Sequence, residues 1–135
     1  WLMGSTSDAA VGDSIATSVT GENATNIRNL AGQTELSEAI DLLSMATAVV
    51  SNDSGLMHIS AALGRPLVVV YGSTSPGFTP PLGDCVEVLS VPVDCGPCFQ
   101  RECPRGDVKC LVELEPERVV VALDRLVDAV TLEQA

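Results

Sequence analysis

The sequence predicts an α/β fold in which a parallel sheet is flanked by helices. Short apolar runs of strand length alternate with stretches whose apolar residues recur at helical spacing, and this alternation favours right-handed crossovers between parallel strands. Apolar residues make up 46% of the chain but aromatic residues only 3%, so Val, Leu, Ile and Ala must form the core. A length of 135 residues fits one domain. No apolar run reaches the roughly 18 residues of a membrane span.

The amino-terminal part predicts two strands around one helix. Residues 1–5 form an apolar segment that is typical of the end of a strand. The polar cluster 6–8 can cap a helix, which we expect over 9–18. Residues 25–30 then predict a short strand.

A second helix is predicted after the turn and cap at 32–34, opening at Glu35. Its apolar positions recur at helical spacing. They are Leu36, Ile40, Leu43 and Ala46. The next strand, 48–50, leads directly into a run of small polar residues.

That polar run starts the most informative stretch of the chain. Asp53 or Ser54 can cap a helix, which Gly64 and Pro66 bring to an end. The helix N-terminus therefore opens at the carboxyl end of a strand. In parallel sheets ligands bind at this edge, and free amides there favour an anion.

The side chains at this helix start have a functional and a structural interpretation. The Ser54 hydroxyl and nearby amides could hold a diphosphate, Gly55 would let a ligand approach the backbone, and Asp53 could bind sugar hydroxyls. The alternative is an ordinary capped helix, although Gly so early in a helix costs up to ~1 kcal/mol relative to Ala. Spacing alone leaves both interpretations open.

Three further residues could contribute to the same edge. His58 lies one turn beyond Ser54 and could donate to a phosphate or sugar, or could tie the helix to a loop. Ser73 and Thr74 follow the predicted strand 67–71, where they could be ligand donors or ordinary loop residues.

Asp8 follows the first predicted strand and could contact a ribose or simply cap a helix. The sequence contains no G-x-G-x-x-G fingerprint and no Walker lysine, so neither a dinucleotide site nor a P-loop is predicted.

The carboxyl-terminal part alternates loops with regular elements. The loop 72–81 is rich in Pro and Gly, and a strand is expected over 85–91. An irregular loop, 94–110, contains four of the five cysteines, and Pro116 suits the first position of a last helix. The cysteine spacing Cys95-x2-Cys98-x4-Cys103-x6-Cys110 allows a tetrahedral zinc site, disulfides or reduced thiols.

The net charge of −11, with a single lysine, argues against a nucleic-acid surface. A phosphorylated ligand would have to be bound by local donors, such as a helix N-terminus with its partial positive charge.

Several motifs together resemble glycosyltransferase family 9, the ADP-heptose:lipopolysaccharide heptosyltransferases, and within it the heptosyltransferase II type. The resemblance covers essentially the whole chain. It is carried by Asn52-Asp53-Ser54-Gly55-Leu56-Met57-His58, Ala61-Ala62-Leu63-Gly64-Arg65-Pro66, Tyr71-Gly72-Ser73-Thr74-Ser75-Pro76, Thr79-Pro80-Pro81, Leu30-Ala31-Gly32-Gln33-Thr34-Glu35-Leu36 and Gly4-Ser5-x-x-Asp8. The cysteine-rich loop is similar to one in some members.

This resemblance implies the carboxyl-terminal half of a GT-B fold, a Rossmann-like domain that binds ADP-heptose or ADP. By position, Asp53, Ser54, Gly55 and His58 would hold the diphosphate and sugar, Asp8 would lie near the ribose and Thr34 near the adenine. The enzyme would be inverting and would need no cofactor. Its acceptor would be the inner core of lipopolysaccharide, at the inner face of the cytoplasmic membrane.

The family pattern also implies parts that this sequence lacks. A first strand with a phosphate-binding lysine and an amino-terminal domain with the catalytic base would precede Trp1. We therefore expect residues 1–135 to be a single partial domain, inactive alone, with no catalytic residue of its own. Unshared strand edges would favour a homodimer or a swapped assembly. The alternative is a non-catalytic module that binds nucleotide sugars or regulates another protein.

Overall fold

The computed structural model describes residues 1–133, and the chain divides into two compact units, Trp1–Leu42 and the part from Leu43 onward. The prediction of one partial domain over the whole chain stays a prediction. None of the helices in the described residues is both long enough and apolar enough to cross a membrane.

The first unit is built around one helix. A short 3-10 helix, η1 (Thr6–Asp8), runs into α1 (Ala9–Ser18), which confirms the helix predicted there. A second 3-10 helix, η2 (Glu22–Asn26), follows.

The two strands predicted in this unit are reduced to one parallel bridge between Leu2 and Asn29. The prediction of a strand over 25–30 is wrong: Thr25 and Asn26 belong to η2, and only Asn29 forms a bridge. The cause is local: Gly21 enters the turn with a φ of 81°, and the Thr25 hydroxyl donates to the carbonyl of Glu22 at 3.3 Å. Such bonds offer the backbone an alternative to a sheet ladder.

Helix α2 (Leu36–Met45) forms where its apolar spacing predicts it. The Glu38 carboxylate accepts a hydrogen bond from the amide of Glu35 at 2.8 Å, which satisfies a backbone donor at the start of the helix.

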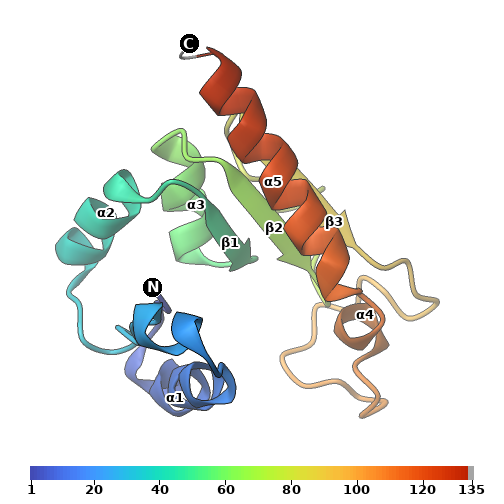
Figure 1. Ribbon diagram of the computed structural model, residues 1–135. Coiled ribbons are helices and arrows are strands. Elements are labelled where there is room, and N and C mark those ends of the chain that lie inside the picture. The colour runs from blue at the N-terminus through green and yellow to red at the C-terminus, as the bar shows by residue number, and fades with distance from the viewer. Residues whose placement is uncertain (134–135) are drawn as a thin grey trace. The chain divides into compact units, whose positions relative to one another are not determined.

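The second unit contains an open parallel sheet in the order β1-β2-β3. Its elements are β1 (Val49–Asn52), α3 (Gly55–Ala62), β2 (Leu67–Tyr71), β3 (Val86–Ser90), α4 (Lys109–Val112) and α5 (Pro116–Glu133). Helix α3 covers one face of the sheet and α5 the other (Figure 1). This confirms the predicted α/β class with a parallel sheet and flanking helices.

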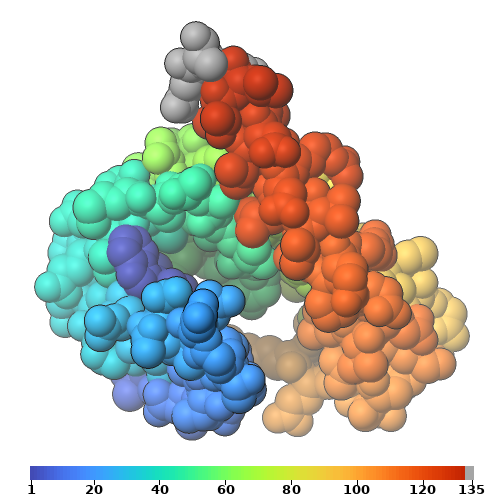
Figure 2. Space-filling model, in the orientation of Figure 1, coloured from blue at the N-terminus to red at the C-terminus, as the bar shows by residue number. Residues whose placement is uncertain are grey.

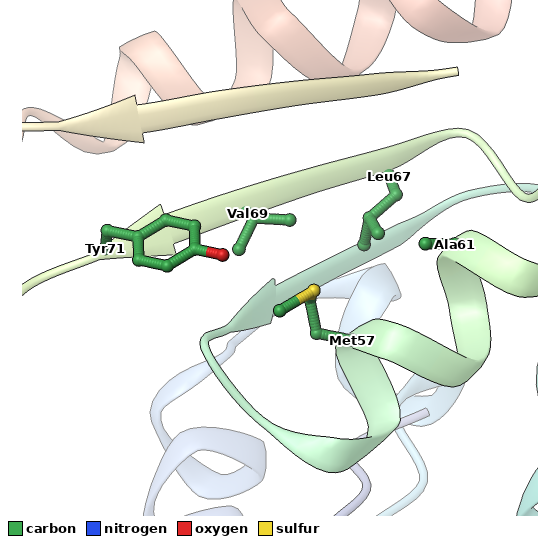
Figure 3. Close-up of a cluster of buried hydrophobic side chains, with 5 residues drawn as sticks. All are labelled: Met57, Ala61, Leu67, Val69 and Tyr71. Carbon is green, nitrogen blue, oxygen red and sulfur yellow. The ribbon is translucent and has the colours of Figure 1, made fainter. Parts of the chain in front are cut away.

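Strand β2 is central, and its alternating side chains serve both faces. Leu67, Val69 and Tyr71 pack against Met57 and Ala61 of α3 (Figure 3).

The intervening residue Val68 turns to the opposite face, where it packs with Leu89, Leu114 and Ala122. Two buried faces explain why the strand is apolar throughout.

The last helix begins at Pro116, as predicted, and its outer side forms a ridge that starts at the α4 segment (Figure 2). The short helix α4 was not expected: it takes Lys109 and Cys110 out of the loop predicted over 94–110. Loop 94–108 has no regular element.

Candidate functional site

All three strands of the second unit are parallel, so their carboxyl ends share one edge of the sheet. The turn before α3 follows β1 there, and the loop 72–85 follows β2. The chain after Ser90 leaves β3 at the same edge. Ligands of open α/β sheets bind outside this edge.

Ser54, rather than Asp53, caps α3. Its backbone is extended, with φ −157° and ψ 167°, and its hydroxyl oxygen accepts from the amide of Met57 at 3.3 Å. The amides of Gly55 and Leu56 have no carbonyl partner within the helix, as in every first helical turn. The motif therefore presents backbone donors at the sheet edge.

Asp53 is linked to the loop after β2. The Thr79 hydroxyl donates to the Asp53 carboxylate at 3.0 Å, and the Tyr71 hydroxyl donates to the carbonyl of Thr79. Burial, followed by the nearby Asp53 carboxylate, raises the pKa of the Tyr71 phenol, while its hydrogen bond to Thr79 opposes this shift. The phenol thus keeps its proton and holds the loop against the sheet.

Gly55 and His58 are exposed on the first turns of α3. A Cβ atom at Gly55 would meet no atom within 4 Å, so nothing inside this chain requires glycine there. The bare backbone is open to an approaching ligand.

Ser73 and Thr74 are half-buried in the loop after β2. The carbonyl of Ser73 accepts a hydrogen bond from the amide of Phe99 at 2.8 Å. The rings of Phe78 and Phe99 pack edge to face, with their centroids 5.1 Å apart. Loop 94–108 is thereby attached to the loop that carries these two candidates.

Asp8 and Thr34 belong to the first unit. The Asp8 carboxylate accepts from the hydroxyl and the amide of Ser5, at 2.6 and 2.8 Å. These two bonds lower the pKa of Asp8, the hydroxyl more than the amide. Asp8 therefore acts as a local cap, and its contact with a ribose stays a prediction, as does that of Thr34 with an adenine.

The sequence interpretation did not assign a role to Thr79 or Tyr71. Both residues stand in motifs that carry the family resemblance, and the Thr-Pro-Pro run ends a loop that begins at the ligand edge, but neither signal indicates a contact with Asp53. Its partner Asp53 lies 26 residues earlier, a separation that spacing rules for single elements cannot bridge.

The five cysteines form no disulfide. Backbone N–H groups, first that of Val108 and then that of Arg105, lower the pKa of the Cys103 thiol. Burial, followed by the neighbouring thiols, raises the pKa of Cys110. Within residues 1–133, no three His, Cys, Asp or Glu side chains are placed to hold a metal ion as they stand.

Comparison with known proteins places the chain in a family. The profile of glycosyltransferase family 9 (heptosyltransferase) matches residues 1–109. The chain belongs to this family. Among its curated relatives, lipopolysaccharide heptosyltransferase 2 of Escherichia coli is 39% identical over 125 residues, which are 93% of this chain and 36% of the relative. Lipooligosaccharide heptosyltransferase 2 of Haemophilus ducreyi is 41% identical over 129 residues, which are 93% of this chain and 37% of the relative.

Solved structures of family 9 have the same fold. The structure of E. coli ADP-heptose LPS heptosyltransferase II matches with a TM-score of 0.83 and 39% identity, over 99% of this chain and 37% of that one. A family 9 glycosyltransferase from Veillonella parvula matches with a TM-score of 0.74 at 21% identity, over 93% of this chain and 35% of that one, which supports the fold alone. The family 9 chain thus spans little more than a third of the length of the relatives and structures it matches.

Proposed function

We propose that this family 9 chain is the donor-binding part of an inverting heptosyltransferase, with ADP-heptose as the donor. The observation that carries the proposal is the Asp53-Ser54-Gly55 helix start at the carboxyl edge of a parallel sheet, in a chain that belongs to a heptosyltransferase family. Heptosyltransferase II of E. coli, a structural relative, is described by its donor, ADP-heptose.

The diphosphate lies at the N-terminus of α3 in this proposal. The first-turn amides and the helix dipole attract its charge. The Ser54 oxygen accepts from Met57, and its O–H, which lies 3.2 Å from the Ser51 hydroxyl oxygen, can turn from Ser51 to donate to a phosphate oxygen. Gly55 allows the ligand to reach the backbone.

The sugar and nucleoside are assigned to the remaining candidates. Asp53, which Thr79 orients, accepts hydrogen bonds from heptose hydroxyls. His58, Ser73 and Thr74 supply further polar contacts.

In the other unit, Asp8 is proposed to lie near the ribose and Thr34 near the adenine. The chain's net charge of −11 gives no general attraction for an anion, so the backbone amides and hydroxyl at the α3 N-terminus must account for binding of the diphosphate.

The chemistry that such a site supports is direct displacement at the anomeric carbon. The oxygen of an acceptor hydroxyl attacks that carbon and its proton passes to the catalytic base, while the bond to the ADP oxygen breaks and ADP departs with the electron pair. Amides at the α3 N-terminus stabilise the charge that develops on ADP.

The acceptor in this proposal is a heptose of the lipopolysaccharide inner core, at the inner face of the cytoplasmic membrane. The catalytic base and the acceptor site are assigned to parts outside these 135 residues, so the chain alone binds donor without transferring sugar.

Replacing Asp53 by Asn in the full-length protein tests the assignment. The change keeps the side chain's size and removes its charge. We expect kcat/KM for transfer from ADP-heptose to fall roughly 10- to 100-fold, because a hydrogen bond to a charged group contributes about 1.5–3 kcal/mol.

Asp84→Asn is the matched control, because Asp84 is exposed further along the loop after β2. It should leave kcat/KM within about twofold. Wild-type transfer by the folded Asp53→Asn protein would remove Asp53 from the site.

A further inference from the structure

Four of the five cysteines meet around one hollow in the second unit. We call it the four-cysteine hollow, and its volume is about 110 Å³. Its cysteines are Cys95, Cys98, Cys103 and Cys110. Electrostatic interactions connect Cys110 with each of the other three thiols. The spacing in the sequence therefore corresponds to real proximity in the fold.

The loop around the hollow is folded back on itself by two contacts. Arg105 donates to both carboxylate oxygens of Asp94, at 2.7 and 3.1 Å, next to Cys95. The amide of Gly106 donates to the carbonyl of Cys103 at 3.1 Å, and Gly106 has a φ of 74°. These contacts place the Cys95 end of the loop beside the turn that follows Cys103.

The turn after Cys103 directs backbone donors at its sulfur. The backbone N–H groups of Val108, Arg105, Gly106 and Asp107 lie near this sulfur, and the Cys103 thiol donates weakly to an Asp107 carboxylate oxygen at 3.8 Å. Backbone N–H groups converging on one atom form an anion-binding nest, which suits a thiolate.

Little else holds this loop in place. Residues 94–108 contain no helix or strand, and most of their side chains are exposed. Its contacts with the loop after β2 include the hydrogen bond from the Phe99 amide to the Ser73 carbonyl and the ring contact between Phe78 and Phe99. A segment without a core of its own usually requires a disulfide or a metal.

We propose that the four cysteines of the hollow bind one Zn²⁺ ion as thiolates, and that this ion ties loop 94–108 to the start of α4 and holds it against the loop after β2. The chain has one histidine, His58, which is placed on α3, so the ligand set is four sulfurs. Four thiolates are the usual donors of a closed, tetrahedral structural zinc site.

Binding requires the sulfurs to move closer together, because no three metal-binding side chains in the described part of the chain hold such positions as they stand. A zinc–sulfur bond is about 2.3 Å long. Rotation of side chains in a loop without backbone ladders provides this movement, and loss of the thiol protons accompanies it. Zinc binding and ordering of the loop are thus one event.

Metal analysis of the full-length protein, purified without chelators, tests the proposal. We expect about one zinc per chain, and tetrahedral thiolate–cobalt absorption bands when Co²⁺ replaces zinc. Cys98→Ser should lose most of the zinc. Cys85→Ser is the matched control, since Cys85 precedes β3 and does not line the hollow, and it should retain the metal.

The cobalt titration uses the wild-type protein, so it does not depend on how well a variant folds. Absence of both zinc and cobalt bands, with every thiol reacting freely, would overturn the proposal. Disulfides among the four cysteines in the freshly purified protein would overturn it as well. Neither result would touch the Asp53 assignment, which transfer activity tests separately.

Discussion

At the scale of single residues, the charge of Asp8 stabilises the turn in which this residue lies. Its carboxylate accepts two hydrogen bonds from Ser5, and they lower its pKa below the ordinary value of 3.8. A carboxyl whose pKa is lower in the folded state stabilises the fold above its unfolded pKa. This contribution disappears as the pH falls through the folded pKa.

Asp8→Asn should therefore destabilise the chain at neutral pH but not in acid. We expect the melting temperatures of wild type and Asp8→Asn to converge as the pH is lowered below about 4, measured by circular dichroism. Ser5→Ala removes the hydroxyl donor and should show part of the same convergence. A constant difference across the whole pH range would mean that the Asp8 charge contributes nothing.

Residues also set the limit of what the sequence could predict about the site. Ser54, Gly55 and His58 were found because their spacing places them on one helix start. Thr79 and Tyr71 were not, because their role depends on a loop that returns to Asp53 across the sheet edge. Such a return is decided by tertiary packing rather than by local pattern.

At the scale of elements, β2 and α3 form the support for the proposed site. Strand β2 lies where its apolar run predicts it, because burial on both faces requires apolar side chains throughout the strand. Helix α3 begins after the predicted cap and ends before the predicted stop at Gly64–Pro66. The strand predicted over 25–30 failed for the opposite reason. None of these residues is buried, so hydrogen bonds within the turn determine the local structure.

Met57→Ala tests the packing of α3 on the sheet. Met57 is fully buried against Leu67 and Val69, so the truncation leaves a cavity. We expect the free energy of unfolding, measured with urea, to fall by about 2–5 kcal/mol. Met45→Ala is the control, since Met45 is 65% exposed at the end of α2, and it should change stability by less than about 1 kcal/mol. Equal effects would show that α3 is not packed as described.

At the scale of the whole molecule, segments of the second unit that are far apart in the sequence contact one another at the carboxyl edge of the sheet. Thr79 connects the loop after β2 with Asp53 at the α3 start, and Phe99 connects loop 94–108 with Ser73 in that same loop after β2. In the proposed donor site the helix start is therefore one wall, and these loops are the second wall. We infer that zinc in the four-cysteine hollow would order the second wall without contacting the donor.

If a diphosphate approaches the backbone at Gly55, a methyl group added there weakens its binding, and calorimetry of ADP with Gly55→Ala in the full-length protein measures this effect. A methyl group there meets no atom within 4 Å, so the fold should keep or slightly raise its melting temperature. We predict that the Kd for ADP rises at least about tenfold, which corresponds to ~1.4 kcal/mol, and that wild type prefers ADP to UDP. An unchanged Kd in a folded Gly55→Ala protein would contradict the account.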